Sequence, residues 1–158
     1  MAGMPLIVIL LSVLGLAPLI GCGLGAIGPD PQTATRMLQA LIGYSALILA
    51  FAGGVHWGFE LQAPHANRFV GRLRLGIPVV ALLAAWAALV LPVVVAPVSA
   101  LIVLVAAYVG AILVEHRAAP YDALPPRYLW LRWGFTIPAI AILVIVLTLR
   151  LLGQTIEF

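Results

Sequence analysis

The stretch LGIPVVALLAAWAALVLPVVVAPVSALIVLVAAYVGAILV, residues 75–114, decides the fold of this chain. It contains no Asp, Glu, Lys or Arg, and it is about twice as long as the roughly 20 apolar residues that one bilayer crossing needs. Pro92 and Pro97 interrupt it near the middle, and proline in a helix interior breaks or kinks the helix. The stretch therefore predicts a tight hairpin of two membrane-spanning helices, at about 75–91 and 98–114.

The rest of the chain repeats this pattern of apolar runs between charged residues. No charged residue precedes Asp30, none lies between Arg36 and Glu60, and none lies between Arg132 and Arg150. These gaps predict further spans at about 5–24, 37–59 and 131–152. We therefore expect an all-α integral membrane bundle of five transmembrane helices, which forms one transmembrane domain over residues 1–158.

The composition excludes a water-soluble domain. The chain is 65% hydrophobic and 8% charged, whereas a soluble domain carries about 25% charged residues. The formal charge of +3 does not indicate a nucleic-acid partner, because the sequence has no lysine and its arginines are scattered at the ends of the predicted helices. The expected surroundings are the lipid bilayer.

Cys22 is the only cysteine, so no disulfide can form within the chain. With the preceding Leu19-Ile20-Gly21 it resembles a lipobox, and cleavage there would leave four transmembrane helices. Signal peptides begin with a positively charged segment, and residues 1–21 contain no Lys or Arg. The pattern favours an ordinary first helix and leaves lipidation of Cys22 open.

The arginines predict the orientation, because positively charged short loops stay on the cytoplasmic side. Six of them fall in the connections between the second and third and between the fourth and fifth predicted spans: Arg68, Arg72, Arg74, Arg117, Arg127 and Arg132. Only Arg36 and Arg150 lie on the other side. We expect a multi-pass protein of the cell inner membrane, with a cytoplasmic N-terminus and the C-terminus outside.

Small residues recur every fourth position of the second predicted helix, at Ala46, Ala50, Gly54 and Gly58. Residues four apart are neighbours on a helix, and small side chains let membrane helices approach closely. The stripe predicts a helix-packing seam. A site that accommodates a ligand is the alternative.

A polar rim is the candidate site for chemistry. It joins residues from the cytoplasmic ends of the predicted helices: His56, Glu60, Glu115, His116, Arg117, Arg127 and Arg132. Imidazole and carboxylate together suit a transition metal or a proton relay. An arginine–carboxylate network that fixes the loops is the competing structural interpretation. No strong catalytic motif or paired-cysteine motif is present, so we expect no catalytic residues and no cofactor, and the metal question stays open.

Two motifs resemble a known family. They are Gly43-Tyr44 followed by the stretch from Phe51 to Gly58, FAGGVHWG, and the segment LPPRYLWLR at residues 124–132. They resemble the proteobacterial inner-membrane proteins of unknown function that include the vertebrate mitochondrial transmembrane protein 69. The resemblance implies a membrane location and no particular activity, and it supplies no site residues.

Two functions from different classes follow as hypotheses. The first is a non-enzymatic accessory or assembly component that packs through the seam against other membrane proteins or a second copy. The second is a small transport, redox or metal-binding protein with a His/Glu site at the cytoplasmic rim.

Overall fold

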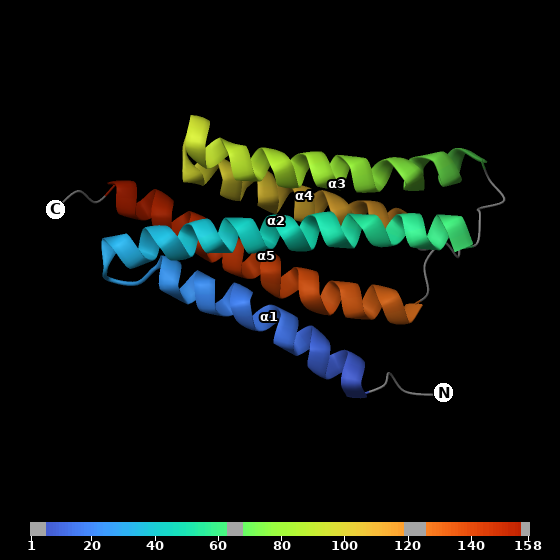
Figure 1. Cartoon of the computed structure of the whole chain (residues 1–158), viewed down its shortest axis with the longest axis horizontal. Coiled ribbons are helices and arrows are strands. Elements are labelled where there is room, and N and C mark those ends of the chain that lie inside the picture. Colours follow the sequence, from blue (N-terminus) through green and yellow to red (C-terminus); the bar gives the residue numbers. More distant parts are fainter. Residues whose placement is uncertain (1–5, 63–67, 119–125, 156–158) are drawn as a thin grey trace.

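Five helices pack side by side into an elongated bundle (Figure 1). The computed structural model describes residues 6–62, 68–118 and 126–155, and the helices fill nearly all of these ranges. They are α1 (Leu6–Ala26), α2 (Pro31–Gln62), α3 (Arg68–Val94), α4 (Pro97–Ala118) and α5 (Pro126–Thr155). The expected all-α fold with five helices is thereby confirmed.

Four of these helices contain segments long and apolar enough to cross a membrane: Pro31–Gln62, Leu75–Val94, Pro97–Arg117 and Tyr128–Gly153. The first helix contributes a shorter apolar stretch, Leu10–Ala26, which includes the half-buried Cys22. By its helix composition the chain is a multi-pass membrane protein that suits a lipid bilayer. A fifth crossing by α1 stays a prediction.

The hairpin between α3 and α4 turns later than the position of Pro92 suggested. Pro92 lies inside α3, which continues to Val94, and α4 begins at Pro97. The amide of Ala96 donates to the carbonyl of Leu91 and closes the turn. A proline inside a membrane helix is tolerated where neighbouring groups satisfy the freed carbonyls, and proline at the first helical position needs no hydrogen-bond donor.

Helix α2 is the central element, because it packs against α1, α3 and α4. The hydroxyl of Tyr108 on α4 donates to the carbonyl of Ser45 on α2 at 2.8 Å, and both residues are fully buried. At 32 residues α2 is about 48 Å long, which exceeds the roughly 30 Å of bilayer hydrocarbon. Its last turns meet the end of α4 and the start of α5 at one end of the bundle (Figure 1).

Candidate functional site

Three ionisable side chains from three helices meet at that end of the bundle, and we call them the His–Glu–Arg cluster. The Nε of Arg132 on α5 donates to Oε1 of Glu115 on α4 at 3.0 Å. The Nε2 of His56 on α2 lies 3.3 Å from the same oxygen. One carboxylate oxygen therefore joins α2, α4 and α5.

The cluster is buried inside the bundle and does not lie on its surface. The exposed fractions are 3% for His56, 1% for Glu115 and 8% for Arg132. Arg132 is the fifth residue of the apolar segment that begins at Tyr128, and His56 lies six residues before the end of α2, about 9 Å along the axis. An ionised side chain at this depth is costly unless it is paired with an opposite charge, as Glu115 and Arg132 are with each other.

The other predicted rim residues divide into three groups. Glu60, one turn beyond His56 on α2, is also buried at 7% exposure. His116 and Arg117 are exposed at the end of α4, and the His116 ring lies 5.9 Å from that of Trp133. Arg127 belongs to α5, but its side chain lies outside the described residues. The structure thus brings His56, Glu115 and Arg132 into contact and places His116 and Arg117 apart from them.

Within the described part of the chain, the cluster leaves hydrogen-bonding capacity unused. Arg132 donates a hydrogen bond to Glu115 through Nε alone of its nitrogens in the contact at 3.0 Å, and that contact engages one of the two carboxylate oxygens. The Oε2 of Glu115 and the hydroxyl of Tyr128 are buried with no partner among the described residues. Buried polar atoms are usually paired, so unpaired ones at a single place suggest a site for a further group.

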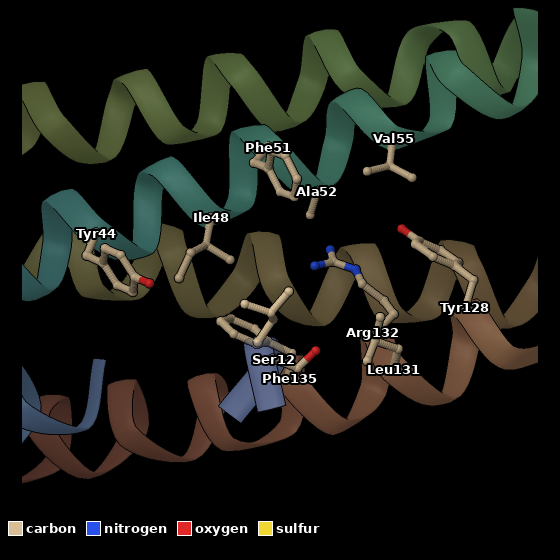
Figure 2. Close-up of a pocket in the computed structure, with 11 residues that line it drawn as sticks. Ser12, Tyr44, Ile48, Phe51, Ala52, Val55, Tyr128, Leu131, Arg132 and Phe135 are labelled. Atoms are coloured by element: carbon tan, nitrogen blue, oxygen red, sulfur yellow. The ribbon is translucent and has the colours of Figure 1, made fainter. Parts of the chain in front are cut away.

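These donors lie beside a cavity of about 510 Å³ between α1, α2 and α5, which we call the lateral cavity. Arg132 and Tyr128 of α5 line one part of it, and Phe51 and Tyr44 of α2 line another. Figure 2 shows the Arg132 guanidinium and the Tyr128 hydroxyl both directed from α5 toward α2. Most of the other lining residues are apolar, such as Phe135.

The sequence did not indicate this cavity. Nothing in the local pattern marked Tyr44 or Phe51 as neighbours of Arg132. The cavity that these residues line depends on the tilt of α1, because the N-terminal half of α1 diverges from α2 (Figure 1). The recurrence of aromatic residues on α2 and α5 was the one available signal.

The described side chains do not form a metal centre. Among them, no group of three or more His, Cys, Asp or Glu residues is placed to hold an ion. His56 and Glu115 are only two such residues, and the guanidinium of Arg132, which contacts the same Oε1 as His56, places a positive charge beside them. The arrangement instead suits hydrogen-bond donation from a fixed guanidinium.

The predicted small-residue stripe turns from the core to the surface along α2. Ala46 is buried and Ala50 is half-buried, whereas Gly54 and Gly58 are exposed, and a Cβ added at either glycine would have no atom of the described chain within 4 Å. Each four-residue step overshoots a helical turn by about 40°, so the four positions do not share one face. Of the described glycines on α2, Gly53 is the one in close contact with a neighbouring helix, because a Cβ there would lie 2.6 Å from the Cβ of Ala81 on α3.

Comparison with known proteins gives one match. Residues 4–148 match a family described as protein of unknown function (DUF3429). No curated protein and no solved structure matches the chain.

Proposed function

We propose that this chain, which belongs to the DUF3429 family of proteins of unknown function, is a non-enzymatic accessory component of the cell inner membrane. In this role it packs against other membrane proteins, or against a second copy, through the exposed face of α2. The same proposal includes the relationship to transmembrane protein 69, which is supported by the FAGGVHWG stretch at residues 51–58.

The observation that supports this role is the exposed pair Gly54 and Gly58. Both lie in the Pro31–Gln62 segment, and a Cβ at either position would meet nothing within 4 Å. Leu47, Phe51 and Leu61 flank them on the same face at 66%, 78% and 77% exposure. Bare backbone between large apolar side chains allows another membrane helix to approach closely.

The test compares Gly58→Leu with Gly134→Leu, since Gly134 on α5 is also exposed with nothing within 4 Å. In mild detergent the wild type and Gly134→Leu should migrate on native gels as a complex, whereas Gly58→Leu should migrate as a monomer. A monomeric wild type, or equal migration of the two variants, would refute the proposal.

We also propose that the His–Glu–Arg cluster lies toward the cytoplasm, with the N-terminus inside. The support is that six of the eight arginines belong to the helix ends beside the two connections at that side, α2 to α3 and α4 to α5. A reporter enzyme that is active only outside the membrane, fused to Phe158, should be active. If the same reporter were active when fused to the N-terminus, the orientation would be the opposite of the one proposed.

One observation favours a second function, the binding of a ligand at the cytoplasmic rim. Arg132 belongs both to the buried ion pair and to the wall of the lateral cavity. Of the transport, redox and metal-binding activities that the sequence left open, a metal centre has the least support from the described residues. Extraction of small molecules from purified protein tests this function, because a molecule present in the wild type should be lost from Ala52→Phe, which places a large side chain in the lateral cavity and leaves the ion pair intact.

A further inference from the structure

We propose that the lateral cavity binds a prenylated quinone of the membrane, with a quinone carbonyl at Arg132 and Tyr128 and the tail along α2. The inference rests on the second function above and names its ligand. It does not depend on the packing of Gly58 against a partner.

The cavity has the shape that a head and a tail require. Along α2 its lining runs from Val55 to Tyr44, which are eleven positions apart, or about 16 Å of helix. Arg132 and Tyr128 place polar groups near the end of the bundle. The other polar lining residues are Tyr44, whose hydroxyl is already donated to the carbonyl of Gly15 at 2.7 Å, and Ser12, which also has an interaction of its own. A volume of about 510 Å³ falls within the range of small-molecule sites.

The cavity opens toward lipid. Phe51 lines it and is 78% exposed, and Leu11 lines it from α1 and is 59% exposed. Phe51 lies well inside the Pro31–Gln62 segment, so the surface that it reaches is at membrane depth. A ligand that enters there comes from the bilayer and carries enough hydrocarbon to dissolve in it.

The charges favour an uncharged head group. The Arg132 guanidinium is always ionised, and Glu115 supplies the opposite charge at 3.0 Å. A second anion would lie near the Glu115 carboxylate in a medium of low dielectric constant, where like charges repel strongly. A carbonyl oxygen accepts hydrogen bonds from the Nη groups and from Tyr128 without adding charge.

The aromatic lining favours a flat ring. Tyr44, Phe51, Tyr128 and Phe135 all line the cavity and come from two helices that face each other across it (Figure 2). Aromatic rings interact favourably in offset or edge-to-face contacts beyond the burial of their area. A quinone combines this ring with carbonyl acceptors and a prenyl tail.

The test is equilibrium binding of decylubiquinone to the purified full chain in detergent, followed by quenching of tryptophan fluorescence and by the quinone retained after gel filtration. One equivalent should bind per chain, whatever the oligomeric state. Ala52→Phe fills the cavity from α2 and should abolish binding, while Ala106→Phe, at an exposed position on α4, should bind as the wild type does.

A second variant keeps the test decisive if Ala52→Phe does not fold. Tyr128→Phe removes a hydroxyl that has no partner in the described chain, so the fold should be kept while quinone affinity falls about tenfold. No binding by the wild type, or unchanged affinity of Tyr128→Phe, would overturn the proposal. The proposal would also be overturned if palmitate or phosphatidylglycerol displaced bound decylubiquinone at equal concentration, because the cavity would then bind an anionic ligand as well as it binds the quinone.

Discussion

Two arginines of α5, Arg132 and Arg150, lie at opposite ends of the bundle and bind different kinds of acceptor. Arg132 is 8% exposed and donates from Nε to the Glu115 carboxylate, which His56 also contacts. Arg150 is half-buried and donates from Nη2 to the backbone carbonyl of Ala26 at 2.9 Å, at the last residue of α1. The first arginine therefore neutralises a buried charge, and the second caps a helix.

The difference shows how burial changes the contribution of the same side chain. A cation at a helix C-terminus interacts with the partial negative charge of unpaired carbonyls, and its loss exposes those carbonyls to other donors. A buried carboxylate that loses its arginine has no such substitute. The two ends of α5 should therefore respond very differently to the removal of their arginines.

The largest effect should come from Arg132→Met. The substitution leaves the Glu115 carboxylate buried with His56 alone, and a buried charge without its partner costs about 3–5 kcal/mol of stability. Thermal unfolding in detergent should show a large loss, or the protein should fail to accumulate in the membrane.

The matched control is the double variant Glu115→Leu with Arg132→Met. It replaces both charges by apolar groups, and such replacements of buried ion pairs are often neutral or stabilising. The double variant should recover most of the stability lost in the single variant. If both are equally unstable, Arg132 acts by packing and the contrast with Arg150 is not one of charge.

Adjacent glycines on α2 give the next largest contrast. In Gly53→Ala the new methyl would lie 2.6 Å from the Cβ of Ala81 and 3.3 Å from the Cα of Pro78, so α2 and α3 must separate. This overpacking should lower the free energy of unfolding by about 1–3 kcal/mol. In Gly54→Ala the methyl meets nothing, and the gain in helix propensity stabilises by up to about 1 kcal/mol. Unfolding in detergent should therefore shift in opposite directions, and shifts of equal sign would contradict the tight α2–α3 contact.

The glycine pair illustrates what the sequence could predict of the fold. Runs without charge predicted five helices, because the number of spans follows from apolar length alone. Which face of α2 is buried did not follow, since consecutive residues point about 100° apart and both Gly53 and Gly54 lie in one apolar run. Only the position of α3 distinguishes them.

The candidate site was predictable in part for the same reason. His56, Glu115 and Arg132 were expected at one rim because each lies near the end of an apolar run. Their contact depends on the rotation of three helices, which also places His116 and Arg117 outside it. The lateral cavity depends on the tilt of α1, and no local pattern encodes that tilt.

A smaller effect is expected from Arg150→Ala. The substitution removes a cation and its hydrogen bond to Ala26 from the end of α1 without leaving a buried charge. We expect it to lower the free energy of unfolding by about 1 kcal/mol. Hydrogen exchange should accelerate at the amides of Ile27 and Gly28, which close the last turn of α1. Arg150→Lys keeps the charge and should show less acceleration. Unchanged exchange in Arg150→Ala would contradict the capping role.

The smallest effect should be the pH dependence of Asp30, which precedes α2. Hydrogen bonding from the Thr33 side chain, and next from the Thr33 amide at 2.9 Å, lowers the pKa of the Asp30 carboxyl below its ordinary value of 3.8. A lowered pKa in the folded state stabilises the protein above pH 3.8, and this stabilisation disappears as the pH falls through the folded pKa.

The check is the melting temperature of wild type and Asp30→Asn at pH 7 and at a pH below 3.8. Asparagine keeps an N-cap acceptor but cannot titrate, so the wild type should lose slightly more stability on acidification than the variant. Because Asp30 is fully exposed, the difference should also shrink at high salt. A difference as large as that for Arg132→Met would show that this end of the bundle is not governed by local capping.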